Sequence, residues 1–256
     1  HGDVNSSRET HSTPLPTSMS CPEHIDEQPL DADGTKDYQR ILGGFIWTLG
    51  TRLDLSYAIG RLCRYMHAPT TLHMYWAHHM LKYCRKRPNL GLRYKAGGDS
   101  LLEAFCDASY LDGEAGKSTV GFVIKFNGTP VAFKSRLSKI VCTSTAYSEY
   151  VGLYEVSREL VLLRTICKDL GLEQAGPTVI HCDNESAVQI ATSEIETGAH
   201  RHIKSRFHFV RECVSEGQVC VQHIRTGEQQ ADITTKSLAK PLFEKFVFGL
   251  MDTIDI

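Results

Sequence analysis

The sequence predicts an α/β fold, in which a mixed five-stranded sheet with flanking helices is preceded by a small helical unit. Asn127-Gly128 lies between two apolar runs, and this dipeptide is the strongest short-range signal of a β-hairpin. A long apolar stripe with helical spacing follows at about 144–170. Two further strand-like runs, 178–182 and 218–224, alternate with helical segments. Together these features are typical of an antiparallel meander extended by parallel strands through helical crossovers.

The elements of the sheet domain follow one another along the chain. Strands are expected where short apolar runs are bounded by turn-forming residues, at 101–106, 120–126, 129–134, 178–182 and 218–224. Helices are expected at about 144–170, from 185, at 202–215 and from about 229. Gly171 supplies the C-terminal stop of the long helix, because glycine adopts the left-handed conformation that ends many helices.

Composition divides the chain into three parts. Residues 1–35 hold Ser, Thr, Pro and acidic residues but no aromatic residue, so we expect a disordered lead-in that cannot bury enough apolar surface to fold. Residues 36–97 show helical periodicity, including a stripe over 55–66 for which Asp54 is a candidate N-cap. Residues 98–250 then form the sheet domain.

Composition also excludes several classes of protein. With 41% hydrophobic and 23% charged residues, the chain is typical of a soluble globular protein. No run approaches the roughly 18 apolar residues of a membrane span, and the polar stretch 1–20 contains no signal-peptide core, so we expect no membrane partner. Nine cysteines without a CxxC pair indicate reduced thiols in a cytoplasmic or nuclear protein. Because the chain begins with His1 rather than Met, we expect it to be a piece of a longer protein.

Acidic residues fall at the places where an α/β sheet binds its ligands. Asp107 and Asp183 each come just after a predicted strand, at the carboxyl edge of the sheet. Glu149 lies about one turn into the long helix, and Asp232 lies at the start of the last one. If these carboxylates converge, they repel one another unless cations lie among them, and hard oxygen ligands select Mg²⁺ or Mn²⁺. The alternative is that an Asp after a strand forms a turn or caps the next helix, as Asp183-Asn184 would.

Two basic clusters are candidate nucleic-acid contacts, although the net charge of −2 removes any bulk electrostatic argument. The first surrounds the helix expected at 202–215 and contains Arg201, Lys204, Arg206 and Arg211. The second contains Lys82, Arg85 and Lys86, with Tyr83 interleaved. The alternative for both clusters is a helix face that is simply solvated.

Several sequence blocks, taken in their order, resemble the C-terminal end of copia-type retrotransposon polyproteins, where the end of the reverse transcriptase precedes a ribonuclease H domain. The blocks that carry the resemblance are Tyr38-Gln-Arg-Ile-Leu-Gly-Gly-Phe-Ile-Trp47, Thr51-Arg-Leu-Asp-Leu-Ser-Tyr-Ala58, Asp107-Ala-Ser-Tyr110, Gly116-Lys-Ser-Thr-Val-Gly121, Ser144-Thr-Ala-Tyr-Ser-Glu-Tyr150, Cys182-Asp-Asn-Glu-Ser-Ala187, His202-Ile-Lys-Ser-Arg-Phe-His-Phe-Val-Arg-Glu212 and Gln230-Ala-Asp-Ile-Thr-Thr-Lys236.

The resemblance implies a ribonuclease H-like fold after a small helical reverse-transcriptase remnant at 36–97. It also implies that Asp107, Glu149, Asp183 and Asp232 are catalytic and hold two Mg²⁺ or Mn²⁺ ions, which hydrolyse the RNA strand of RNA–DNA hybrids. The expected partners are such a hybrid and the rest of a polyprotein, in the cytoplasm, the nucleus or a virus-like particle. The paired aspartates of a polymerase hairpin, Tyr-x-Asp-Asp, do not occur, so we expect no polymerase activity.

The chain departs from the family at four places, one of which is Ser138-Lys139-Ile140, where the family usually has Lys-Lys-Gln. Tyr147 stands where the family has a second glutamate, and Tyr110 and Phe133 stand where it has tryptophans. These changes support an alternative, a catalytically silent retrotransposon remnant that at most binds nucleic acid. An integrase or transposase nuclease would share the fold, but there the glutamate follows two aspartates, whereas Glu149 lies between Asp107 and Asp183.

Overall fold

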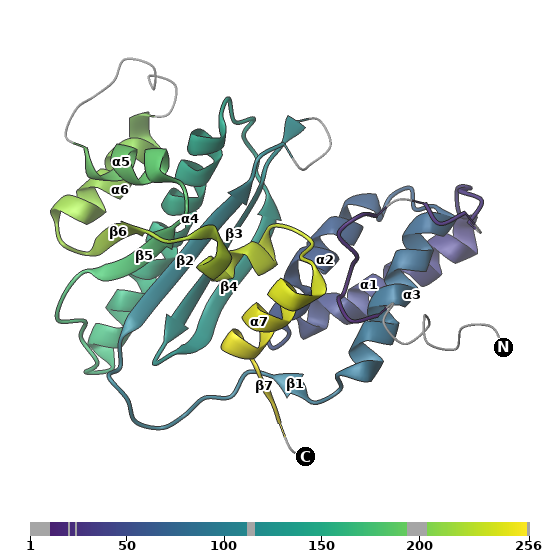
Figure 1. Cartoon of the computed structure of the whole chain (residues 1–256), viewed down its shortest axis with the longest axis horizontal. Helices are drawn as coiled ribbons and strands as arrows, with labels where there is room; N and C mark the ends of the chain where they lie inside the picture. The colour runs from purple at the N-terminus through teal and green to yellow at the C-terminus, as the bar shows by residue number, and fades with distance from the viewer. Residues whose placement is uncertain (1–10, 20, 24, 112–115, 194–203, 255–256) are drawn as a thin grey trace. The chain divides into compact units, whose positions relative to one another are not determined.

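A computed structural model describes residues 11–19, 21–23, 25–111, 116–193 and 204–254, and for 204–207 it describes the backbone alone. The contacts group the chain into two compact units, and Figure 1 colours the chain from purple at its N-terminus to yellow at its C-terminus. The first unit comprises residues 1–93 and 236–256, and the second comprises 94–235. The sequence-based limits at residues 35, 97 and 250 stay predictions, while the structure groups residues 236–256 with the helical unit.

The first unit is helical. Its elements are α1 (Ala32–Thr48), η1 (Leu53–Leu55), α2 (Ser56–Leu62), η2 (Cys63–Tyr65), α3 (Thr71–Lys86), α7 (Lys240–Leu250) and a short antiparallel pair, β1 (Leu90–Gly91) with β7 (Asp252–Thr253). Helix α1 begins where the Asp31 carboxylate accepts a hydrogen bond from Gly34 N at 2.7 Å. Tyr38 is completely buried, and its hydroxyl donates to Leu62 O at 2.7 Å, which ties α1 to α2.

Asp54 is not the helix cap that the sequence suggested. Its side chain is buried and accepts hydrogen bonds from Arg52 at 2.9 and 2.8 Å and from the Tyr83 hydroxyl at 2.7 Å. A buried carboxylate needs an opposite charge and hydrogen-bond donors, and it finds both here. The segment therefore opens with the 3-10 turn η1 before α2 begins.

The part of the lead-in that the structure describes packs against α3, which differs from the expectation of disorder. Leu15 is buried, and Thr13 O lies 3.1 Å from Nε2 of His79. The composition of 1–35 is poor in apolar residues on average, but a buried leucine, a hydrogen-bonded backbone carbonyl and the ring contact between His11 and His79 join residues 11–19 to the helical unit.

The second unit contains a mixed five-stranded sheet, which confirms the predicted architecture. The strands are β2 (Leu102–Ser109), β3 (Thr119–Phe126), β4 (Thr129–Leu137), β5 (Thr178–Cys182) and β6 (Val219–His223). They lie in the order β4-β3-β2-β5-β6, as Figure 1 shows. Strands β2, β3 and β4 pair antiparallel, with Asn127-Gly128 at the hairpin turn, whereas β5 and β6 join in parallel.

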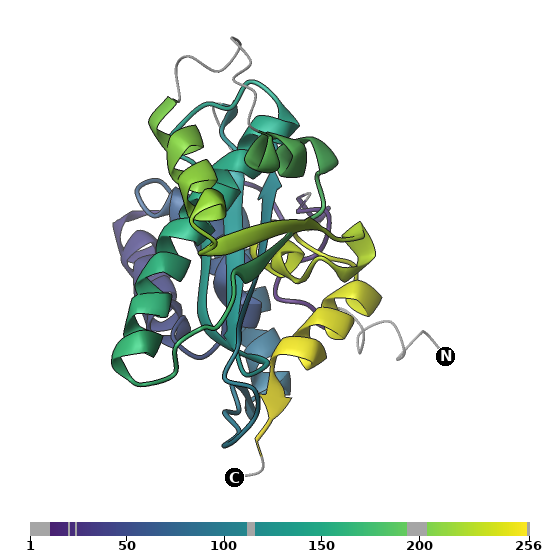
Figure 2. The same cartoon turned by 90° about the vertical axis from the view of Figure 1, so that its left-hand side faces the viewer.

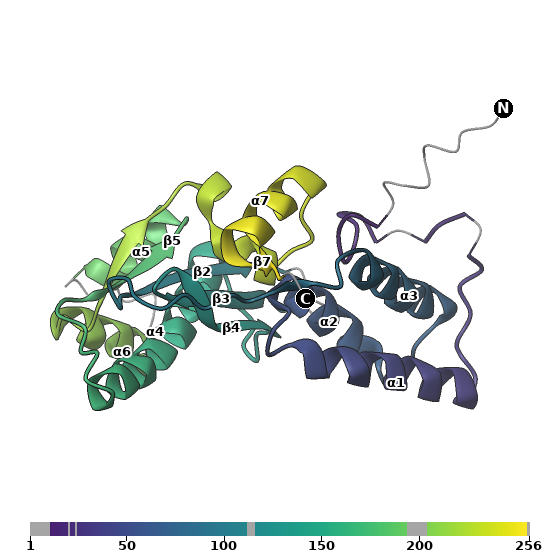
Figure 3. The same ribbon diagram turned by 90° about the horizontal axis from the view of Figure 1, so that it is seen from below.

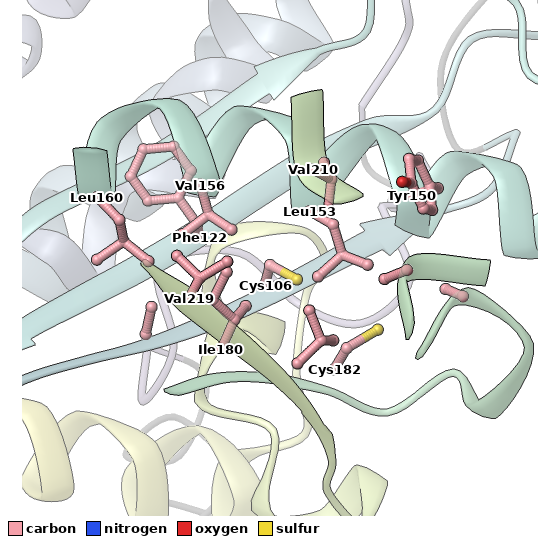
Figure 4. Packing of buried hydrophobic residues seen from close by; sticks show 14 of the residues in the cluster. Cys106, Phe122, Tyr150, Leu153, Val156, Leu160, Ile180, Cys182, Val210 and Val219 are labelled. Carbon is pink, nitrogen blue, oxygen red and sulfur yellow. The ribbon is translucent and has the colours of Figure 1, made fainter. Parts of the chain in front are cut away.

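Helices cover one face of this sheet. They are α4 (Thr145–Asp169), α5 (Glu185–Thr192) and α6 (Lys204–Ser215). Figure 4 shows how Leu153 and Val156 of α4 meet side chains of the strands, including Cys106, Phe122 and Ile180. Figures 2 and 3 show α4 and α6 on this face, and the short turn η6 (Gln230–Thr234) on the other.

The prediction of a helix from about residue 229 is wrong in where the helix begins. The chain first makes two 3-10 turns, η5 (Thr226–Glu228) and η6, and α7 begins only at Lys240. The Gln229 side chain accepts from Ala231 N, and the Thr234 hydroxyl donates to Ala231 O, so local side-chain bonds hold the tight turn. Pro241 then favours a helix start, because proline fits the first turn of a helix.

Glu103 on β2 joins three strands through an ion-pair cluster. Its Oε1 lies 2.9 Å from Nε2 of His181, and its Oε2 lies 2.7 Å from Nζ of Lys125. The bond from His181, with help from Lys125, lowers the pKa of the Glu103 carboxyl to about 2. The cluster therefore contributes stability above the ordinary carboxyl pKa, and this contribution is lost as the pH falls toward 2.

We expect Glu103→Gln to lower the free energy of unfolding at pH 7 by about 0.5–1 kcal/mol, a small value because the side chain is 41% exposed. Urea denaturation at pH 7 and pH 3 measures this, and the difference from the unsubstituted chain should shrink at the lower pH. Glu173→Gln, which removes an exposed pair with Lys168, is the control and should have little effect. A Glu103→Gln deficit that is equal at both pH values would contradict the expectation.

Candidate metal centre

Three acidic side chains from three elements converge at one edge of the sheet. Asp107 lies on β2, Glu149 on α4, and Asp183 directly after β5. One carboxylate oxygen from each lies within 4.8 Å of the other two. Strands β2 and β5 are parallel neighbours, and their last paired residues are Phe105 and His181. Each aspartate follows its strand's last paired residue by two positions, so the two lie at the same edge of the sheet. The predicted convergence of these three carboxylates is present in the structure.

Asp107 is inside a strand rather than after one, which corrects the sequence-based placement. Strand β2 continues to Ser109, because its pairing with β3 extends to Thr119. Its pairing with β5, however, ends at Phe105. Asp107 therefore lies where the parallel ladder has stopped and the antiparallel ladder continues, so its side chain is held by a rigid strand.

Glu149 is positioned by the start of α4. The Ser144 hydroxyl caps the helix by accepting from Tyr147 N at 3.2 Å, which sets Glu149 in the second turn beside β2. Its carboxyl is 3% exposed and accepts a hydrogen bond from the backbone N–H of Ala108. Among the described residues, its Oε2 has no hydrogen-bond partner.

Burial raises the pKa of the Glu149 carboxyl well above its usual range. The negative charge of Asp107 raises it further, and smaller contributions come from Cys182 and Asp183. A carboxyl with an unpartnered buried oxygen, beside two other carboxyls, lacks a positive charge. The environment thus favours a cation at this place.

Asp183 and Asn184 have separate tasks, which decides between the two sequence interpretations of this pair. Asn184 caps α5, because its side-chain oxygen accepts from Ala187 N at 3.0 Å. The carboxylate of Asp183 belongs instead to the acidic cluster.

The turn η6 reaches the acidic cluster through Thr235. The Thr235 hydroxyl donates a hydrogen bond to Oδ2 of Asp107, and both side chains are buried. Gly121 lies opposite Asp107 on β3 and makes this approach possible. A Cβ at Gly121 would lie within 2.8 Å of Thr234 Cβ and 2.9 Å of Thr235 Cγ2, distances that real side chains do not tolerate.

Asp232, the fourth predicted ligand, lies outside the group of three. It is 2% exposed in η6, and its backbone oxygen lies 3.3 Å from the Thr235 hydroxyl that binds Asp107. Asp232 therefore occupies the same turn that contacts the cluster, and its role as a ligand stays a prediction.

Sequence reasoning missed three residues around the cluster, namely Gly121, Gln229 and Thr235. Gly121 carried a usable signal, because a glycine inside a strand often marks the close approach of another backbone. Gln229 and Thr235 carried none, since a polar residue before or after a turn is ordinarily exposed, yet both are completely buried here.

The basic residues predicted to contact nucleic acid differ in their exposure and contacts. Lys82, Arg85 and Lys86 are exposed on α3. Arg201 and the side chains of Lys204 and Arg206 lie outside what the structure describes. Arg211 Nε donates to Ile190 O at 3.1 Å and so joins α6 to α5. Tyr83 is completely buried against Asp54, so it cannot stack on a base as an interleaved aromatic would.

The donor set suits a hard divalent cation. The three ligand groups are carboxylates, which select Mg²⁺ or Mn²⁺ over metals that prefer nitrogen or sulfur. The buried, unpartnered oxygen of Glu149 is the second sign that the residues fit such an ion. The chemistry that acidic clusters of this kind support is phosphoryl transfer or hydrolysis.

The strand order and the acidic cluster give the second unit a ribonuclease H-like fold. No protein-family model matches the chain. The chain is 32% identical to the retrovirus-related Pol polyprotein from transposon RE2 of Arabidopsis thaliana, over 91% of this chain and 16% of that polyprotein. It is 32% identical to the RE1 polyprotein of the same plant, over 82% of this chain and 14% of that polyprotein. The chain is thus homologous to copia-type retrotransposon Pol polyproteins, and it spans 14–16% of their length.

Among solved structures, the chain is similar to LC11-RNase H1, which was isolated from compost by a metagenomic approach. The two share 18% identity over 57% of this chain and 97% of that one, with a TM-score of 0.41. Within the part of the chain that the structure describes, no helix is long and apolar enough to cross a membrane.

Gly121→Ala tests whether the close approach of η6 holds Asp107 in place. The new methyl group should push Thr234 and Thr235 away, break the hydrogen bond to Asp107, and lower the free energy of unfolding by about 1–3 kcal/mol. Gly43→Ala is the matched control, because nothing lies within 4 Å of a Cβ there and alanine favours the helix α1. Chemical denaturation of the two variants measures both effects, and a Gly121→Ala chain as stable as Gly43→Ala would contradict this account.

Glu149→Gln should stabilise the cation-free chain. The raised pKa means that the protonated carboxyl suits the fold, so stability is fully present below the unfolded pKa and is lost as the pH rises through the folded pKa. Glutamine is neutral at every pH. With a chelator present, the free energy of unfolding of the variant should therefore be about 0.5–2 kcal/mol higher than that of the unsubstituted chain at pH 8, and nearly equal to it at pH 4. Added Mg²⁺ should then stabilise only the unsubstituted chain. Equal stabilisation of both chains by Mg²⁺ would show that Glu149 is not a ligand.

Proposed function

We propose that the 94–235 unit is a ribonuclease H that depends on divalent cations and hydrolyses the RNA strand of RNA–DNA hybrids. The observation that carries the proposal is the convergence of three carboxylates, with one buried oxygen of Glu149 lacking a partner among the described residues. The homology to retrotransposon Pol polyproteins supports the substrate class, because reverse transcription leaves RNA paired with its DNA copy.

Each residue of the centre has a distinct role in this proposal. Asp107 and Asp183 would hold two Mg²⁺ or Mn²⁺ ions as the central ligands, and Glu149 and Asp232 would each complete one ion. When bound, the cations supply the positive charge that phosphodiester hydrolysis needs. Glu149 must release its proton as they bind, since its pKa is raised in their absence. Thr235 holds the Asp107 carboxylate in one orientation through its hydrogen bond.

The wider partners are also proposals. Basic side chains from the two predicted clusters contact phosphates of the hybrid, namely Lys82, Arg85, Lys86, Arg201, Lys204, Arg206 and Arg211. The helical residues 36–97 are the end of a reverse transcriptase, and the remaining polyprotein is the protein partner, inside the cell or a virus-like particle. The chain spans 14–16% of the length of these relatives.

One observation favours a second candidate, a silent remnant that binds the hybrid without cutting it. Tyr147 stands where the family resemblance calls for a second glutamate, and its side chain is 6% exposed in the first turn of α4. A buried phenol in that position cannot replace a carboxylate as a ligand. The remnant predicts hybrid binding but no cleavage, whatever cation is present.

Cleavage of a labelled RNA–DNA hybrid with Mg²⁺ or Mn²⁺ decides between the two. The unsubstituted chain should cut the RNA strand, and Asp183→Asn should lower the rate by about 100-fold or more, because a ligand charge is lost. Asp169→Asn makes the same chemical change at an exposed position at the end of α4 and should keep full activity. A folded chain that binds the hybrid but leaves it uncut with either cation would overturn the nuclease and support the remnant.

A further inference from the structure

Gln229 lies at the point where β2 and β5 separate, and it is completely buried. Its side-chain Nε2 donates to Cys106 O of β2 at 3.0 Å and, over a longer 3.4 Å, to His181 O of β5. Its Oε1 accepts from Ala231 N at 3.2 Å in η6. One side-chain amide thus connects β2, β5 and the turn η6 that directly follows it.

These contacts replace the backbone ladder where it stops. The pairing between β2 and β5 ends at Phe105 beside His181, so Cys106, the next residue of β2, is not paired with β5. An unpaired buried carbonyl is costly, and a primary amide carries two N–H donors on one nitrogen. The Gln229 amide therefore bridges the two strands across the gap that opens between them.

The contacted groups are neighbours of the acidic residues in sequence. Cys106 directly precedes Asp107, His181 lies two positions before Asp183, and Ala231 directly precedes Asp232. Any change in the distance between the contacted backbone groups therefore changes the distance between these carboxylates. No local sequence pattern indicates this link, because Gln229 lies 123 residues from Cys106 along the chain.

We propose that Gln229 is a positioning residue that sets the spacing of Asp107, Asp183 and Asp232 for cation binding. This inference rests on the proposed function of the same site. Gln229 acts through the backbone of β2, β5 and η6 and does not touch the cation or the RNA. Residues that orient ligands in this way change metal affinity by about 10- to 100-fold when they are replaced.

Gln174, in the loop between α4 and β5, offers a matched control at the other end of β2. It is also a buried glutamine, with Oε1 accepting from Leu102 N at 2.8 Å and Nε2 donating to Ser100 O at 2.8 Å and Leu172 O at 3.1 Å. These bonds lie at the opposite end of β2 from Asp107. Gln229→Met and Gln174→Met thus remove the same amide, with similar length and no new charge, at the two ends of one strand.

The test is Mn²⁺ binding to the full chain by isothermal titration calorimetry, without nucleic acid. We expect Gln229→Met to weaken Mn²⁺ binding by about 10-fold or more and Gln174→Met to leave it within about twofold. Both variants should have a lower free energy of unfolding than the unsubstituted chain. Gln229→Asn keeps both donors on a shorter side chain and should give an intermediate affinity, which serves if the Met variant does not fold. Equal affinities for the two Met variants would show that Gln229 is merely structural and would overturn the proposal.

Cleavage of the hybrid separates this failure from failure of the proposed function. If the unsubstituted chain binds Mn²⁺ and cuts RNA while Gln229→Met binds Mn²⁺ equally well, the positioning role alone is wrong. If the chain binds Mn²⁺ without cutting RNA, the nuclease is wrong, and the affinities of the variants still decide the role of Gln229. If the unsubstituted chain binds no Mn²⁺, both proposals are wrong.

Discussion

The mutual repulsion of three clustered carboxyl groups, two of them buried and the third partly buried, is the constraint on which the second unit depends. Asp107, Glu149 and Asp183 lie within 4.8 Å of one another, and Glu149 responds with a raised pKa. The fold tolerates this because each group comes from a separate element fixed by the core of β2, α4 and β5. Such an arrangement reduces stability in the absence of a cation, and functional sites commonly show this trade-off.

On the other face of the sheet, a glycine allows a turn to approach the acidic cluster. Gly121 leaves room for η6, and η6 brings the Thr235 hydroxyl to Asp107 and the Gln229 amide to the gap between β2 and β5. The carboxylates are therefore held from both sides, by α4 on one face and by η6 on the other. The hydrogen bonds of Thr235 and Gln229 thus help to fix the positions of the clustered carboxylates.

Much of the fold was predictable, because its signals are local. Asn127-Gly128 marks the hairpin, Ser144 caps the long helix, and the apolar run 178–182 coincides with β5. The predictions that were wrong concerned residues whose state depends on distant partners. Asp54 pairs with Arg52 and Tyr83 instead of capping a helix, and the chain after residue 229 forms 3-10 turns before α7. Local pattern alone cannot distinguish these cases.

The succession of strands and helices along the chain, and the interest of Asp107, Glu149 and Asp183, could be predicted from neighbouring residues, because periodicity and strand ends are local features. Which polar side chains are buried became known from the folded chain alone, since burial is set by segments far apart in the sequence. It separated the tasks of Asp183 and Asn184, placed Thr235 on Asp107, and put Gln229 between two strands. The physical reason is that hydrogen bonds and Coulomb interactions depend on distance in space, while a sequence records only distance along the chain.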